Sequence, residues 1–98
     1  MIIIKNIKSL QKQIKSIKLG NNKISLVPTM GSLHEGHLSL VKKAKEKKRI
    51  VIVSIFINPS QFGPNEDFAK YPKNISKDIN LLKKLSANIV FLPHNKEI

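Results

Sequence analysis

The stretch that most constrains the fold of this chain runs from Ile50 to Ile57 and reads Ile-Val-Ile-Val-Ser-Ile-Phe-Ile. It is apolar throughout except for Ser54, and most of its residues are β-branched. A strand that is buried on both faces has this composition, whereas a half-exposed strand alternates apolar and polar residues. Such strands occur in parallel sheets, whose neighbouring strands are joined by long crossovers, usually helices. The run therefore predicts an α/β protein with a parallel sheet.

Three shorter apolar runs predict the other strands of this sheet. Ile2 to Ile4 is expected to form a short buried strand. Ile24 to Val27 is expected to form a second strand, which Pro28 closes where no further ladder donor is needed. Ile89 to Leu92 is expected to form the last strand and to end at Pro93.

The segments between these strands carry apolar residues at helical spacing. The first expected helix runs from its N-cap Asn6 to about Leu19, the second runs from Leu38 to Lys48, and Asn74 is expected to cap the third. A loop from Asn58 through about Tyr71-Pro72 is expected to precede the third helix. The order β-α-β-α-β-α-β predicts a doubly wound parallel sheet. The expected inner faces are Ile7, Leu10, Ile14 and Ile17 in the first helix, Leu38, Val41 and Ala44 in the second, and Ile75, Ile79, Leu82 and Leu85 in the third.

The turn between the second strand and the second helix carries the candidate chemistry, and residues 27–38 read Val-Pro-Thr-Met-Gly-Ser-Leu-His-Glu-Gly-His-Leu. Open α/β sheets bind ligands at such strand-to-helix turns. Gly31 and Gly36 allow the backbone to approach a ligand closely. A helix that begins near Gly36 directs free N–H groups and a partial positive charge at what lies before it, and His34 and His37 add neutral hydrogen-bond donors. These residues predict a site for nucleotide phosphates.

Two other roles for His34 and His37 stay open at this point. Their spacing of three residues places both rings on one helical face, as metal ligands require, but the rest of the chain offers only His94 and scattered carboxylates as further ligands. Capping the helix N-terminus, or lying on the surface, is a more common role for histidines at such a position than metal binding. No metal site is predicted.

The segment His34-Glu35-Gly36-His37 resembles the His-x-Gly-His signature of the nucleotidyltransferase superfamily, which includes class I aminoacyl-tRNA synthetases. The flanking residues narrow this resemblance. They are Pro-Thr-Met-Gly-Ser-Leu before the signature, residues 54–68, and Tyr71-Pro72. Together they resemble the pantoate–β-alanine ligase (pantothenate synthetase) family over essentially the whole chain, which implies a Rossmann-like fold.

The resemblance implies an ATP-dependent ligase that condenses pantoate with β-alanine through a pantoyl-adenylate intermediate, releasing pyrophosphate and then AMP. It implies that residues Met30, Gly31, Ser32, Leu33, His34, Glu35, Gly36 and His37 form the ATP-binding turn, with His37 as the proton donor and His34 beside it as a second catalytic group. It also implies that Gln61, Pro28 and Met30 contact pantoate or β-alanine. Phe62 would line the same pocket or simply pack in the core. ATP is then a substrate, Mg²⁺ is its implied cofactor, and the enzyme is expected to be a homodimer.

Members of this family are much longer than 98 residues. Residues 1–98 therefore resemble the N-terminal part of the Rossmann-like nucleotide-binding domain. The remainder of that domain, with the second phosphate-contacting segment, and the C-terminal domain are absent from this sequence. We expect the 98-residue chain alone to be inactive as a ligase.

Composition bears on the alternatives. The net charge is +12, and residues 1–50 hold 12 Lys/Arg against 2 acids, a balance that basic RNA-binding modules share. However, aromatic residues make up only 5% of the chain and are not interleaved with the lysines, so a base-stacking platform is not predicted. A related adenylyltransferase would share the His-x-Gly-His turn without needing residues 58–68. The absence of cysteine suits a cytoplasmic protein, and the absence of a long apolar run predicts no membrane partner. The scarcity of aromatic residues and the spread of the lysines predict no nucleic-acid partner.

Overall fold

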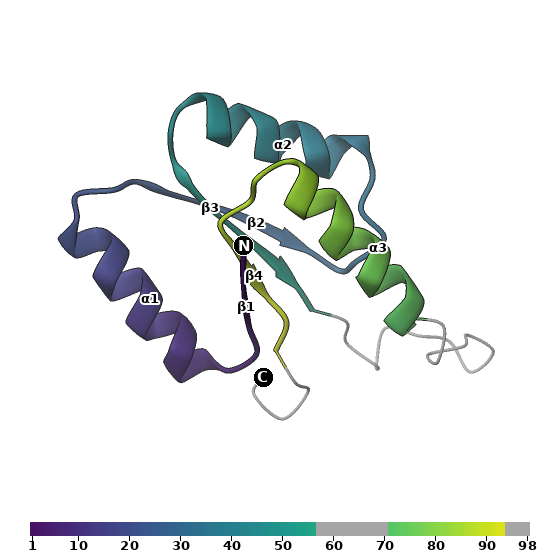
Figure 1. Ribbon diagram of the computed structural model, residues 1–98, viewed down its shortest axis with the longest axis horizontal. Coiled ribbons are helices and arrows are strands. Elements are labelled where there is room, and N and C mark those ends of the chain that lie inside the picture. Colours follow the sequence, from purple (N-terminus) through teal and green to yellow (C-terminus); the bar gives the residue numbers. More distant parts are fainter. Residues whose placement is uncertain (57–70, 94–98) are drawn as a thin grey trace.

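In the computed structural model, which describes residues 1–56 and 71–93, four parallel strands form one sheet with helices on both faces (Figure 1). Strand order in the sheet is β1-β4-β3-β2. This arrangement confirms the predicted Rossmann-like, doubly wound α/β architecture. The elements in chain order are β1 (Ile2–Ile4), α1 (Ile7–Leu19), β2 (Ile24–Thr29), α2 (Glu35–Glu46), β3 (Ile50–Ile55), α3 (Tyr71–Lys84) and β4 (Ile89–Phe91).

The direction of each crossover decides which face its helix covers. The first crossover carries the chain from β1 at one edge to β2 at the opposite edge of this four-stranded sheet, and the next two return it through β3 to β4. Since parallel crossovers are almost always right-handed, opposite directions place the helices on opposite faces. Accordingly, α1 lies on one face, and α2 and α3 lie together on the other (Figure 1).

Strand β3 is the centre of the core. Val51, Ile52 and Val53 are all almost completely inaccessible, which confirms the prediction of burial on both faces. Val51 and Val53 belong to the cluster beneath α2 and α3, whereas Ile52 belongs to the cluster beneath α1. The expected inner face of α1 packs on the second cluster, and Asn6 caps this helix by accepting from the Ser9 N–H at 2.9 Å.

Two predictions about the strands are wrong in part. Only Ile4 of β1 is buried; Ile2 and Ile3 are 49% and 42% exposed because β1 is an edge strand. Pro28 does not close β2, which continues to Thr29 with Pro28 opposite Ser54 of β3. β2 is the other edge strand of the described sheet, so a residue without an N–H is tolerated within it.

One helix start agrees with the prediction and another differs from it. Helix α2 begins at Glu35, close to Gly36 as expected and ahead of the apolar stripe that starts at Leu38, and His34 is its N-cap. Helix α3 begins at Tyr71, so Asn74 lies inside the helix and does not occupy its N-cap position. The expected loop residues from Asn58 onward, with Gln61 and Phe62, lie outside the described residues up to position 70. Within the described part of the chain, no helix is long and apolar enough to cross a membrane.

Candidate functional site

The candidate turn starts at the carboxyl end of β2, where Thr29 fastens it to the neighbouring strand. The Thr29 hydroxyl donates to the carbonyl of Ser54 in β3 at 3.0 Å and accepts from the Gly31 N–H at 3.2 Å. The Phe56 N–H donates to the Thr29 carbonyl at 3.1 Å. The first residues of the turn are therefore held against the carboxyl ends of two adjacent parallel strands, the edge at which open α/β sheets bind ligands.

The backbone of the turn is left-handed at two successive residues, Gly31 (φ 92°) and Ser32 (φ 52°). Glycine adopts this conformation without a steric penalty, but a residue with a Cβ does not. Ser32 therefore needs surrounding contacts that hold it in place.

Asp78 of α3 supplies those contacts. Its carboxylate accepts from the Ser32 N–H at 2.8 Å and from the Leu33 N–H at 2.9 Å, and the residue is only 2% exposed. Sequence reasoning missed this residue. The available signal was an acidic side chain at position 78, three residues after Ile75 and four before Leu82, and therefore on the face that was expected to be apolar.

His34 and His37 cap the N-terminus of α2 reciprocally. His34 Nδ1 accepts from the Gly36 N–H at 3.1 Å, and His37 Nδ1 accepts from the His34 N–H at 3.3 Å. The ring centroids lie 4.0 Å apart with the planes tilted by 37°. Capping was one of the roles left open for these histidines, and the structure confirms it.

The capping bonds fix where each imidazole carries its proton. A ring nitrogen that accepts a hydrogen bond is unprotonated, so both neutral rings hold their proton on Nε2. Partial burial lowers the pKa of His37, His34 lowers it further, and Asp78 acts in the opposite direction. The lowered pKa of His37 favours its neutral form, in which Nε2–H is free to donate to a ligand.

Gly36 is required by the His34 ring. A Cβ at this position would lie 2.8 Å from His34 Cε1 and 3.1 Å from Nδ1, closer than side-chain atoms pack. The absence of a side chain thus lets the ring close over the helix N-terminus. This is a steric reason for the glycine in the His-x-Gly-His pattern.

The expectation of free N–H groups at this helix N-terminus is wrong for several residues. The N–H groups of Gly31, Ser32, Leu33, His34 and Gly36 all donate to side-chain acceptors. A phosphate that approached these groups would compete with the side chains that hold them. The partial positive charge of the helix end and the imidazole Nε2–H groups remain as attractions for an anion.

The predicted ATP-binding residues 30–37 span the turn after β2 and the first residues of α2. Met30 is 60% exposed at its start, and Pro28 is exposed in the preceding strand. Gln61, the predicted pantoate contact, lies outside the described residues. Within residues 1–56 and 71–93, no three His, Cys, Asp or Glu side chains lie close enough together to hold a metal ion.

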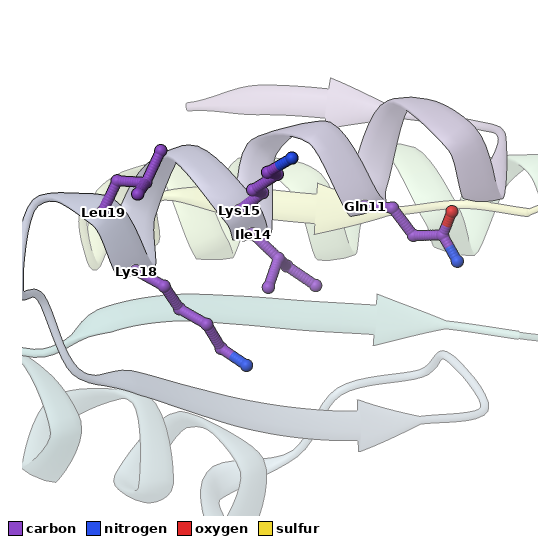
Figure 2. A pocket seen from close by; sticks show the side chains of 5 residues that line it. All are labelled: Gln11, Ile14, Lys15, Lys18 and Leu19. Carbon is purple, nitrogen blue, oxygen red and sulfur yellow. The ribbon is translucent and has the colours of Figure 1, made fainter.

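An open hollow of about 420 Å³ lies elsewhere, along α1. Figure 2 shows the five side chains that line it, and all of them come from this one helix. No residue of the turn is among them, and the hollow is lined by two lysines, a glutamine and two apolar side chains. We therefore assign the candidate site to the turn. The five lining residues are Gln11, Ile14, Lys15, Lys18 and Leu19.

Comparison with known sequences gives a consistent result. The sequence profile of the Pantoate-beta-alanine ligase family matches residues 2–98. The pantothenate synthetase of Thermoanaerobacter pseudethanolicus is 52% identical over 98 residues, which is 100% of this chain and 35% of that protein. The pantothenate synthetase of Buchnera aphidicola from Acyrthosiphon pisum is 54% identical over 98 residues, which is 100% of this chain and 34% of that protein. The chain thus spans about a third of the length of the curated relatives it matches.

Solved structures agree with the sequence matches. The crystal structure of the pantoate-beta-alanine ligase from Francisella tularensis, complexed with beta-gamma ATP and beta-alanine, superposes with a TM-score of 0.74 at 48% identity. It is matched over 99% of this chain and 37% of that one. The pantothenate synthetase from Thermus thermophilus superposes with a TM-score of 0.69 at 33% identity, over 99% of this chain and 33% of that one.

Proposed function

The chain belongs to the pantoate–β-alanine ligase family, and on that premise we propose that it supplies the ATP-binding turn of a ligase that joins pantoate to β-alanine. We further propose that residues 1–98 are the N-terminal part of the Rossmann-like nucleotide-binding domain. Catalysis then also needs polypeptide equivalent to the rest of the relatives. By full-length ligase we mean a polypeptide of the relatives' length in which residues 1–98 have this sequence.

One observation carries the assignment of the turn to ATP: the reciprocal capping of His34 and His37 at the N-terminus of α2. It leaves two Nε2–H donors beside the positive end of a helix, at the carboxyl edge of a parallel sheet. Phosphoryl oxygens are the acceptors that suit such a site. The relative from Francisella tularensis, which was crystallised with an ATP compound and beta-alanine, supports the same substrates for this chain.

The first step of the proposed reaction joins the pantoate carboxylate to the α-phosphorus of ATP. A carboxylate oxygen attacks, the bond to the β-phosphate oxygen breaks, and pyrophosphate leaves with the electron pair. Negative charge rises on the phosphoryl oxygens during this displacement, so fixed donors stabilise its transition state. His34 and His37 donate hydrogen bonds from Nε2 to these oxygens and keep their protons, so the donor role expected for His37 from the resemblance is proposed as that of a hydrogen-bond donor.

The second step uses the acyl adenylate as an activated acyl donor. The β-alanine amine attacks the acyl carbon, AMP leaves with the electron pair of the broken C–O bond, and the proton lost by the amine passes to water. The protein's task in both steps is to align reactants and stabilise charge. We propose Gln61, Pro28 and Met30 as the pantoate and β-alanine contacts of this chain, and Phe62 as a further lining residue or a core residue.

The family resemblance implies Mg²⁺ as a cofactor. Among the described residues, no cluster of three or more His, Cys, Asp or Glu side chains could bind this ion. No step above therefore depends on a metal held by this part of the chain, and any such ion would be bound by the nucleotide or by other residues. The homodimer and the cytoplasmic location stay predictions, and neither is used in the argument.

Pyrophosphate exchange tests the proposal directly. The full-length ligase is incubated with ATP and labelled pyrophosphate, with and without pantoate, and label in ATP is measured. Label is expected in ATP only when pantoate is present, because the reverse of the first step needs the acyl adenylate. Exchange that proceeds without pantoate, or equally with an unrelated acid, would instead favour a related adenylyltransferase.

A salt titration distinguishes the proposed ligase from the remaining alternative, a basic nucleic-acid-binding module. A basic nucleic-acid module would bind RNA with an affinity that falls steeply as salt rises, and this affinity would not change on replacing His37. We expect no such binding to compete with ATP.

A further inference from the structure

Asp78 is a buried carboxylate whose partners lie far from it in the sequence. It is in α3, whereas Ser32 and Leu33 belong to the turn after β2. Both of its oxygens are used, because Oδ2 accepts from Ser32 and Oδ1 from Leu33. Burying a carboxylate is costly unless its oxygens are hydrogen-bonded, so these bonds account for the presence of the charge.

The charge of Asp78 does not serve its own helix. Helix α3 begins at Tyr71, so Asp78 lies about two turns inside it. A carboxylate stabilises a helix end only within the first turn. The carboxylate therefore stabilises the two backbone N–H donors of the turn.

We propose that Asp78 is a positioning residue of the ligase: its carboxylate holds Ser32 and Leu33 so that His34 and His37 meet the ATP phosphates. This inference rests on the proposed function, because it assigns the turn to ATP. Asp78 itself does not touch the nucleotide. It acts through the left-handed backbone at Ser32, which precedes the helix cap by two residues.

The chemistry of the carboxylate is specific. Two N–H groups converge on it, and only a group with two acceptor oxygens satisfies both. An asparagine of the same shape would turn an NH₂ group toward one of these donors, leaving one bond unmade and two hydrogens facing each other. A glutamate would add one methylene in a position that is 2% exposed.

The position of the carboxylate also explains why a negative charge is tolerated near a phosphate site. The N–H dipoles of Ser32 and Leu33 point at the carboxylate and offset part of its charge. Asp78 is near enough to act on the nearby histidine, since it raises the pKa of His37 against the effect of partial burial. It therefore adjusts the imidazole as well as the backbone that precedes it.

The test compares Asp78→Asn with Lys77→Gln in the full-length ligase. Lys77 is the exposed neighbour in the same helix, and its replacement also removes one charge. In pantoate-dependent exchange, Asp78→Asn is expected to lower kcat/KM for ATP by about 10- to 100-fold, the equivalent of one charged hydrogen bond. The KM for pantoate should stay within about twofold, and Lys77→Gln should match the parent.

Histidine titration followed by NMR gives a readout that a purely structural residue would not move. Besides His34 and Asp78, Glu35 at the start of α2 carries the nearest charge in the sequence, and it is unchanged in both variants. Loss of the carboxylate should lower the His37 pKa further in Asp78→Asn and not in Lys77→Gln. A variant that keeps the parent's KM for ATP and the parent's His37 titration would overturn the proposal.

A measurement on the parent keeps the proposal testable if Asp78→Asn does not fold. The amide protons of Ser32 and Leu33 should exchange slowly with solvent, equally with and without saturating ATP, since the carboxylate and not the phosphate holds them. A change in the exchange rate of these amides on adding ATP, in either direction, would show that ATP alters their bonds to Asp78, which would overturn the proposal. If the parent shows no pantoate-dependent exchange of pyrophosphate into ATP, the proposed function is refuted. Slow hydrogen exchange of the Ser32 and Leu33 amides would still support their bonds to Asp78.

Discussion

Replacing Gly36 by alanine should separate stability from activity in this protein. The new Cβ would lie 2.8 Å from His34 Cε1, a distance that packed atoms do not reach. The neighbour is the end of a rotatable side chain, so the ring should turn away while the backbone stays. His34 Nδ1 would then lose its bond to the Gly36 N–H, and its Nε2–H would no longer face the front of α2.

Two opposing terms set the change in stability. Losing an N-cap side-chain bond costs about 1 kcal/mol. Alanine in place of glycine in a helix stabilises it by about 1 kcal/mol. We therefore expect the free energy of unfolding of Gly36→Ala to stay close to that of the parent. Activity should not be preserved in the same way, because loss of one donor to a developing oxyanion costs about 10²–10³ in rate.

The assay pairs urea unfolding with pantoate-dependent pyrophosphate exchange in the full-length ligase. Gly20→Ala is a matched control, because its Cβ would meet the end of the Asn22 side chain at 3.0 Å, at the end of α1 and away from the turn. The control should keep full exchange activity. If Gly36→Ala exchanges at the parent rate while its His34 ring is shown to have moved, the ring's capped position is not needed and the reasoning fails.

Three further predictions concern the same turn and the chain as a whole. In the full-length ligase, His37→Ala should lower the rate of adenylate formation by about 10²–10³-fold with little change in pantoate binding. Gln61→Ala should mainly raise the pantoate concentration that the reaction requires. Pantoate titrations of both variants would show the reverse pattern if the two roles were exchanged. Because the pKa of His37 is lowered in the folded state, the unfolded chain takes up a proton first, so the free energy of unfolding should fall as pH drops below about 6.5 and level off once the folded state is also protonated. Urea unfolding from pH 8 to pH 5 should show this slope in the parent and less of it in His37→Ala; equal slopes would contradict the assignment. The 98-residue chain alone should form no pantothenate and should bind ATP weakly. It should also self-associate through the β2 edge of the described sheet, because Leu26 in β2 and Met30 just after it are largely exposed. Pantothenate formation by a chain that light scattering shows to be a stable monomer would refute this prediction.

Local pattern was sufficient for much of the fold. The β-branched run at residues 50–57 predicted a doubly buried strand, and Val51, Ile52 and Val53 are buried from both sides. Asn6 was predicted as a cap from its residue type and its place before an amphipathic segment, and it does cap α1. Asn74 met the same criteria, but the prediction that it caps α3 is wrong, because α3 already begins at Tyr71. Several nearby residues can each be suited to the N-cap position of a helix, and tertiary packing decides which of them occupies it.

The candidate site was predictable as a segment but not as an arrangement. The glycines and histidines of the turn could be assigned from their spacing, whereas the reciprocal histidine caps depend on ring positions that no spacing specifies. The Asp78 bonds join residues in different elements, and their existence depends on how α3 packs against the turn. Sequence periodicity carries no information on that long-range contact.

The pairing of β1 with β4 has a consequence for how the chain folds during synthesis. Ile2 lies beside Ile89, so the first of the four described strands to be synthesised has its partner near the other end of these 98 residues. The β2-α2-β3 unit can form early, since its contacts are local, and it contains the candidate turn. β1 and the apolar face of α1 must wait in the nascent chain until β4 emerges, and closing so long a loop is slow. During that interval the isoleucines of β1 and α1 are exposed, which makes this stage of synthesis the one most in need of a chaperone.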